Sequence, residues 1–157
     1  MPINANLRAL ASVGFLLLAF VTRETTMAAQ GRLATATSVR CEFSQRATGT
    51  WKNGEPQTEL RPAKLSVGFN SIDTQEGTAE AVAQFGSNHI IVRLSRSNLH
   101  FLEISTSGSL FVTTVFDRDA QNGKLQAVHT RHEFTDAMLP RFTSRGEQYY
   151  GECQLQP

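Results

Sequence analysis

The sequence predicts an all-β protein, namely a single small antiparallel barrel or sandwich of about eight strands, preceded by a signal peptide. Three observations predict this. An uncharged apolar run occupies residues 9–21, short alternating apolar segments separated by turn residues fill the chain from Val39 onward, and Cys41 and Cys153 lie near the two ends of that region. Alternation of this kind is typical of strands that bury one face. With 157 residues, the chain is long enough for one domain and too short for two ordinary ones.

Residues 1–28 are interpreted as a secretory signal peptide. The run from residue 9 to 21 is shorter than the about 20 residues that a membrane-spanning helix needs, and small residues at Thr26 and Ala28 favour cleavage before Ala29. Two alternatives stay open: an uncleaved anchor, and a translation start at Met27 that removes the signal.

After cleavage, we expect residues 29–38 to form a flexible N-terminal segment and residues 39–157 to form the barrel-like domain. We expect this domain to be exported, periplasmic or extracellular, and not stably inserted in a membrane.

The first half of the domain contains three segments with strand character. Residues 39–43 place Val39, Cys41 and Phe43 on one face of a strand, and Asn53-Gly54 predicts a tight turn because both residues tolerate positive φ. Residues 65–73 predict the next strand. The alanine-rich residues 77–85 suit either a strand or a short helix, and we expect a strand.

The second half continues with strands and turns at short intervals. Expected strands cover residues 89–94, 99–104, 110–116, 125–134 and 147–155, with turns at 97–98, 106–109 and 122–123 and a loop over 136–146. Turns every 8–12 residues are typical of an up-and-down barrel or a sandwich.

The two cysteines are predicted to form a structural disulfide, because an exported chain meets an oxidising compartment. Closing so long a loop contributes about 4–5 kcal/mol in the chain-entropy model. Cys41 and Cys153 lie in the first and last predicted strands, which are neighbours in a simple barrel, so the pair favours closure of the sheet.

Composition and motifs exclude several function classes. The chain has 15 basic and 14 acidic residues, and removing Arg8, Arg23 and Glu24 with the signal leaves 13 of each sign. A neutral domain lacks the positive charge on which nucleic-acid binding depends. The sequence contains no phosphate loop, dinucleotide fingerprint, Gly-x-Ser-x-Gly motif or metal-ligand spacing, so we expect no cofactor, no metal site and no catalytic residues.

The densest polar group is the segment His129-Thr130-Arg131-His132-Glu133. On a strand, His129, Arg131 and Glu133 share one face and His132 lies on the other, so the two histidines cannot ligate one metal together. If the first face points into a barrel, the trio is suited to bind a carboxylate or phosphate, with Arg131 supplying the forked donor. The alternative is a ladder of solvent-facing polar side chains.

A second unusual feature is that residues 89–116 are apolar on both faces, as in Ile90 with Ile91 and Phe111 with Val112. Strands with one solvated face carry polar side chains there. Either another element covers these strands, or they form a surface that meets a second chain, as in a homodimer.

The order of Gly49-x-Trp51, about eight strands and a terminal disulfide resembles the lipocalin-like, or calycin, barrels. That resemblance implies a barrel that holds small apolar ligands and adds Trp51 to the ligand-binding candidates. The arrangement of Arg40-Cys41-x-Phe43 with Tyr150-Gly151-x-Cys153 also resembles small exported bacterial domains of unassigned function, which carry no activity over to this chain.

Three functions are therefore expected from the sequence. The first is an exported, non-enzymatic protein that binds a small apolar or amphipathic ligand. The second is a structural or protein-interaction domain that acts through the apolar strands of residues 89–116. The third is a hydrolase or isomerase that uses His129, Arg131 and Glu133.

Overall fold

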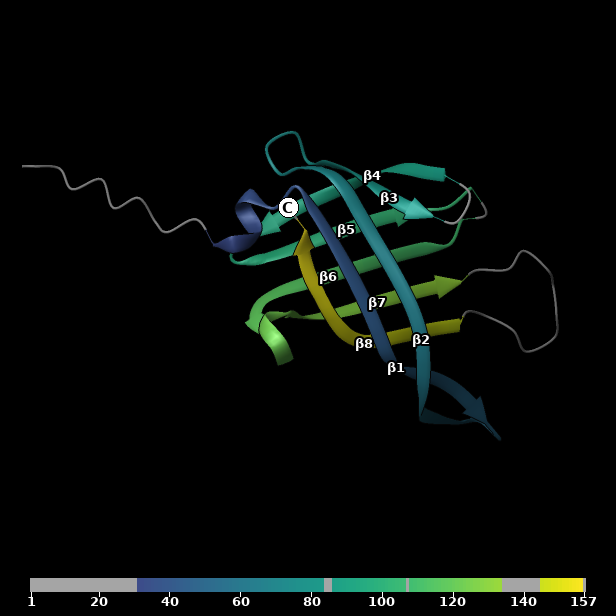
Figure 1. Ribbon diagram of the computed structural model, residues 1–157. Helices are drawn as coiled ribbons and strands as arrows, with labels where there is room; N and C mark the ends of the chain where they lie inside the picture. Colours follow the sequence, from purple (N-terminus) through teal and green to yellow (C-terminus); the bar gives the residue numbers. More distant parts are fainter. Residues whose placement is uncertain (1–30, 84–85, 107, 134–144, 157) are drawn as a thin grey trace, which may run out of the picture.

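The computed structural model describes residues 31–83, 86–106, 108–133 and 145–156, apart from the side chains of residues 50, 51, 83, 86, 87, 133 and 145. Eight antiparallel strands form one sheet that closes on itself, because β1 pairs with β2 on one side and with β8 on the other (Figure 1). This confirms the prediction of an all-β fold with about eight antiparallel strands, and the strands form one sheet instead of the two sheets of a sandwich. We call this closed sheet the ring. The predicted signal peptide, residues 1–28, lies outside the described residues.

The strands follow one another around the ring in sequence order, and two short 3-10 helices, η1 and η2, lie among them. The elements are η1 (Arg32–Thr35), β1 (Ser38–Lys52), β2 (Glu55–Asp73), β3 (Thr78–Ala83), β4 (Gly86–Ser95), β5 (Asn98–Ile104), β6 (Leu110–Asp119), η2 (Gln121–Gly123), β7 (Leu125–Glu133) and β8 (Arg145–Gln156). Within the described ranges, no helix is long and apolar enough to cross a membrane.

Local sequence determines the turns. Asn53 and Gly54 adopt φ values of 54° and 84°, and Asn122 and Gly123 adopt 56° and 73°, as predicted for Asn-Gly pairs that reverse the chain. The alanine-rich segment is a strand, β3, as expected. Its residues alternate between buried and accessible positions, with Ala79 and Ala81 only 1% and 4% exposed, because alternate side chains of a strand point into the ring.

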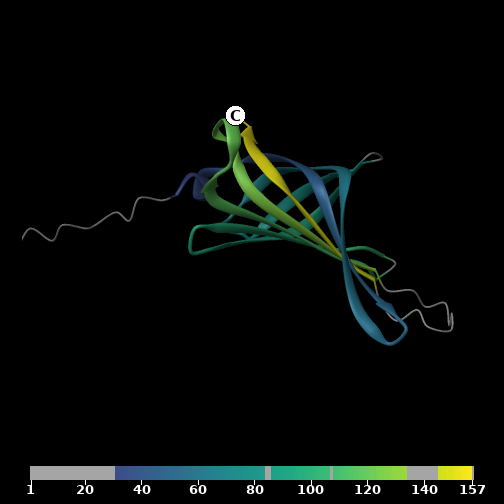
Figure 2. The same cartoon turned by 90° about the horizontal axis from the view of Figure 1, so that it is seen from below.

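The hairpin of β1 and β2 extends beyond the rest of the ring as an arm (Figure 2). Pairing of β1 with β8 stops at Thr48, and pairing of β2 with β3 starts at Gly68. Among the described residues, the outer edge of β2 before Gly68 therefore has no partner strand. Pro56 and Pro62 lie on this edge strand, where the lack of a backbone N–H opposes the addition of further strands.

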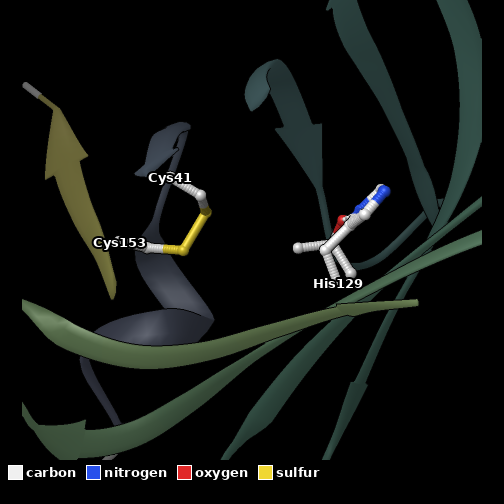
Figure 3. Close-up of a disulfide and its surroundings, with 4 residues drawn as sticks. Cys41, His129 and Cys153 are labelled. Atoms are coloured by element: carbon white, nitrogen blue, oxygen red, sulfur yellow. Dashed lines mark hydrogen bonds between the residues drawn. A yellow bond between two sulfur atoms is a disulfide. The ribbon is translucent and has the colours of Figure 1, made fainter. Parts of the chain in front are cut away.

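Cys41 and Cys153 form the predicted disulfide and stand directly opposite each other in β1 and β8 (Figure 3). Both are fully buried inside the ring. Because these are the first and last strands, the bond links the two strands whose pairing closes the sheet.

The N-terminal segment covers this end of the ring. Leu33 of η1 is 1% exposed, and Arg32 forms ion pairs with Asp117 and Asp119 at 2.7 and 2.8 Å. Residues 29–38 were expected to form a flexible segment before the domain. Their described part, from residue 31 onward, packs against the ring, since Leu33 gains a buried apolar site there.

A β-bulge at Ser44 changes which side chains of β1 face inward. Before the bulge, Cys41 and Phe43 point into the ring, and after it Arg46 and Thr48 do, because one extra residue reverses the alternation. The neighbouring position on β8 is Gly151, where a Cβ would overlap the backbone of Glu42 and Phe43. Glycine is therefore required where the bulged strand approaches β8.

The apolar core fills the half of the ring interior that lies around the disulfide. We call this half the disulfide end. Its most buried side chains are at most 2% exposed, and they include Leu33, Val39, Cys41, Leu99, Val115, Leu125 and Cys153. Beside it, the rings of Phe69 and Phe101 stack with centroids 3.8 Å apart.

The outer face of the ring carries exposed apolar side chains, as expected from residues 89–116. Ile90 points inward and is 6% exposed, whereas Ile91 points outward and is 48% exposed. In the strand pairing Ile91 stands opposite Leu102, which stands opposite Val112. No described element covers Ile91 or the nearby Ile104, which is 73% exposed.

Candidate functional site

In the half of the ring interior away from the disulfide, buried polar side chains lie among aromatic ones. We call them the polar cluster: Arg46, Thr113, His129, Arg131, Glu147 and Tyr149. Strand pairing brings them together, because Arg46 stands opposite Tyr149, Tyr149 opposite His129, and His129 opposite Thr113. Glu147 and Arg131 stand opposite each other in the next inward-facing row.

His129 lies at the centre of the polar cluster and is 6% exposed. Its Nδ1 and the Oγ1 of Thr113 are joined by a hydrogen bond of 2.8 Å. The aromatic rings of Phe43, Phe111 and Tyr149 surround the imidazole at centroid distances of 5.7, 6.1 and 5.8 Å.

This environment controls the charge of the imidazole. Burial, followed by the positive charge of Arg131, lowers the pKa of His129 to about 4. His129 is therefore neutral at pH 7, with one ring nitrogen as a donor and the other as an acceptor. A neutral imidazole with so low a pKa is a weak general base, because efficient bases have a pKa near the working pH.

Tyr149, Glu147 and Arg46 form the second part of the cluster. The hydroxyl of Tyr149 donates a hydrogen bond of 2.7 Å to Oε2 of Glu147, and Nη1 of Arg46 lies 3.3 Å from Oε1 of the same carboxylate. Glu147 is only 5% exposed. Burial and the hydrogen bond to Glu147 raise the pKa of Tyr149 above its ordinary value, so the phenol stays protonated and remains a donor.

Arg131 lines the same interior from β7. Its guanidinium carbon lies 5.7 Å from the centroid of the Phe111 ring, within the range of a cation–π contact. The charge of Arg131 also acts on His129, as the lowered histidine pKa shows. The cluster thus combines guanidinium groups, a neutral imidazole, a phenol and a hydroxyl with aromatic faces.

The structure brings together two of the four predicted ligand-binding residues. His129 and Arg131 lie on the inward face of β7, and the buried position of His129 excludes the alternative of a fully solvent-facing ladder. Glu133 is the last residue of β7, and Trp51 belongs to the arm, where it pairs with Pro56. The side chains of Glu133 and Trp51 lie outside the described residues.

Sequence reasoning missed Arg46, Thr113, Glu147 and Tyr149 as partners of His129. Alternation counted from Cys41 and Phe43 places Gln45 inward and Arg46 outward, and the bulge at Ser44 reverses this. The one available signal was Gly151, since a glycine inside a strand often marks a bulge or a close approach of two backbones.

The hollows on the surface are lined mainly by residues outside the polar cluster. A hollow of about 500 Å³ beside the bulge is lined by residues that include Glu42, Lys64 and Glu152, and Lys124 lies 3.9 Å from Glu42 and 3.4 Å from Glu152. These opposite charges largely compensate one another. Across the described ranges, no three histidine, cysteine or acidic side chains are grouped as metal ligands.

The chain matches no protein-family model, no curated protein and no solved structure. The resemblance to lipocalin-like barrels therefore stays a prediction. At Gly49, the glycine of the Gly-x-Trp pattern, an added Cβ would meet no atom within 4 Å, so no close approach requires glycine at that position.

Proposed function

We propose that this protein is an exported binding protein, not an enzyme, and that it holds a small amphipathic molecule within the ring at the polar cluster. The observation that carries this proposal is the contrast between the two halves of one interior. Apolar side chains fill the disulfide end. At the other end Thr113, His129 and Glu147 are each less than 10% exposed although their side chains are polar or charged.

Stability alone does not account for such a cluster. Burying polar groups costs free energy unless every one is hydrogen-bonded, and replacing buried ion pairs by apolar side chains often stabilises a protein by about 1–4 kcal/mol. Binding sites, in contrast, combine apolar and aromatic walls with a few convergent polar groups. Phe43, Phe111 and Tyr149 supply the walls around His129.

The chemistry of the cluster favours binding over catalysis. A hydrolase or isomerase based on His129 needs an imidazole that exchanges protons near neutral pH, and a pKa of about 4 opposes this. The disulfide supports an oxidising location. We therefore propose residues 1–28 as a signal peptide and a periplasmic or extracellular location.

Native mass spectrometry of the protein purified from an exporting host, without refolding, tests this proposal. We expect a chain that starts at Ala29, weighs two hydrogens less than its reduced form, and retains a small molecule. The double variant Thr113→Val/His129→Leu, which makes the centre of the cluster apolar, should fold and emerge empty. A wild-type protein that retains nothing and binds none of a panel of C8 carboxylates, alcohols and amines would contradict the proposal.

A second candidate function is a protein-interaction domain, and the exposed apolar side chains of the outer face favour it. Ile91 and Ile104 are 48% and 73% exposed, so the described residues do not bury them. Exposed apolar patches are typical of protein–protein interaction sites. This candidate predicts a homodimer in analytical ultracentrifugation that the Ile91→Ser/Ile104→Ser variant dissociates. A strictly monomeric wild-type protein contradicts it.

A further inference from the structure

The ligand's chemical class is indicated by Arg46, which the bulge at Ser44 turns into the ring. Nη1 of Arg46 lies 3.3 Å from Glu147, but Nε is buried and makes no hydrogen bond among the described residues. An unsatisfied buried donor costs about 1–3 kcal/mol, and more when the group is charged. A ligand oxygen placed at this guanidinium would remove that cost.

The electrostatic field in the cluster has a matching sign. Arg46 enters from β1 and Arg131 from β7, on the two sides of β8. Burial lowers the pKa of His129, and the charge of Arg131 lowers it further. Glu147, the buried carboxylate between the two arginines, already accepts the hydrogen bond from Tyr149 and faces Arg46. The described side chains of the cluster place two guanidinium groups around one buried carboxylate, so their net charge is positive. An anionic ligand group balances that charge, whereas a cationic one adds to it.

We infer that the bound molecule carries an anionic group, a carboxylate or a phosphate, that binds Arg46 through its guanidinium. Arg131 and the neutral His129 lie alongside as further donors, and the apolar part of the molecule contacts the rings of Phe43 and Phe111. Forked guanidinium donors match carboxylate and phosphate oxygens in geometry as well as charge. This inference rests on the proposed function, because it specifies the ligand of the same site.

Isothermal titration of the mature, disulfide-bonded protein with matched C8 probes tests the inference. We expect octanoate and octyl phosphate to bind at least tenfold more tightly than octanol, and octyltrimethylammonium to bind most weakly. Sodium acetate and inorganic phosphate, which lack the apolar chain, should bind at least tenfold more weakly than the C8 anions.

Variants of Arg46 separate this role from a general effect of charge. Arg46→Met should lower the affinity for octanoate at least tenfold and leave that for octanol unchanged, and Arg46→Lys should restore part of the loss. Arg40→Met is the matched control, because Arg40 lies on the same strand but is exposed on the outer face. It should bind octanoate like the wild type.

The outcomes distinguish a wrong ligand class from a wrong binding function. If octanol and octanoate bind equally and Arg46→Met changes neither affinity, the anionic class is wrong while the proposed binding function stands. Tighter binding of octyltrimethylammonium would also overturn the anionic class. If no probe binds and the purified protein retains no molecule, the binding function itself fails.

Discussion

The two halves of the ring interior are built on the same strands but use opposite chemistry. At the disulfide end, β1, β7 and β8 contribute Cys41, Leu125 and Cys153, which are at most 2% exposed and contact apolar neighbours. A few residues further along, the same three strands contribute Arg46, His129 and Tyr149 to the polar cluster. The disulfide end holds the ring closed, whereas the polar cluster requires partners for groups that water would otherwise solvate.

This difference indicates that the disulfide end contributes most of the stability and the polar cluster contributes most of the polar groups available for binding. Apolar burial contributes about 25 cal/mol per Å², and a disulfide that closes most of the chain restricts the unfolded state. The polar cluster supplies directed donors and acceptors and little net stability. Substitutions at the two ends should therefore differ in their effect on the free energy of unfolding.

The largest effect is expected from removing the disulfide. The double variant Cys41→Ala/Cys153→Ala should lower the free energy of unfolding by about 4 kcal/mol, because the unfolded chain regains the freedom of a loop spanning 112 residues. Urea unfolding followed by circular dichroism measures the loss. Equal stability of the variant and the wild type would show that strand pairing alone closes the ring.

The second effect concerns η1, which covers the disulfide end. Leu33→Ala should cost about 3 kcal/mol, since it removes a side chain that is 1% exposed and leaves a cavity. Leu60→Ala in the arm is the control, because Leu60 is 66% exposed, and its unfolding midpoint should stay unchanged. A Leu33→Ala midpoint equal to that of the control would mean that η1 does not pack on the ring in solution.

The third effect is a pH dependence that arises at the polar cluster. His129 has a pKa of about 4 in the folded protein against 6.5 in the unfolded chain, so only the unfolded chain gains this proton between those values. Its contribution to stability is complete above pH 6.5 and decreases by about 2–3 kcal/mol as the pH falls to 4, at about 1.4 kcal/mol per pH unit.

Urea unfolding at pH 7 and pH 4.5 measures this contribution. His129→Leu should lose distinctly less stability than the wild type over the same interval, because it has no imidazole to protonate at this position. A parallel decrease in both proteins would place the pH dependence elsewhere in the molecule.

The smallest effect on stability is expected from making the centre of the polar cluster apolar. Thr113→Val alone leaves Nδ1 of His129 without its partner and should cost about 1–2 kcal/mol. The double variant Thr113→Val/His129→Leu removes both partners and should lie within about 1 kcal/mol of the wild type. A double-mutant cycle at pH 7 measures the difference, and a loss above about 3 kcal/mol would assign the cluster a structural role.

Local sequence signals predicted most of the strands because strand alternation and turn chemistry act over a few residues. Asn53-Gly54 and Asn122-Gly123 reverse the chain as expected. The full lengths of β1 and β2 were not predicted. Polar residues in their arm give no alternating signal, because neither face of the arm is buried in the core.

The candidate site was predicted only in part, because its residues come from several strands. His129 and Arg131 share a face of one strand, so alternation alone groups them. Arg46, Thr113 and Tyr149 come from three other strands, and only the pairing register of the ring brings them to His129. Such distant pairings leave no mark within a short window of sequence.

Residue type and local spacing are enough to predict the fold class, the turns and the shared face of His129 and Arg131. The disulfide is predictable for a different reason, because the chain has only two cysteines. The tertiary structure decided which face points inward and where Arg46 lies. A single inserted residue at Ser44, accommodated by Gly151, reverses the alternation of β1 and turns Arg46, which strict alternation would place outside, into the ring. Inward and outward positions differ by one residue along a strand, and only packing against the neighbouring strands selects between them.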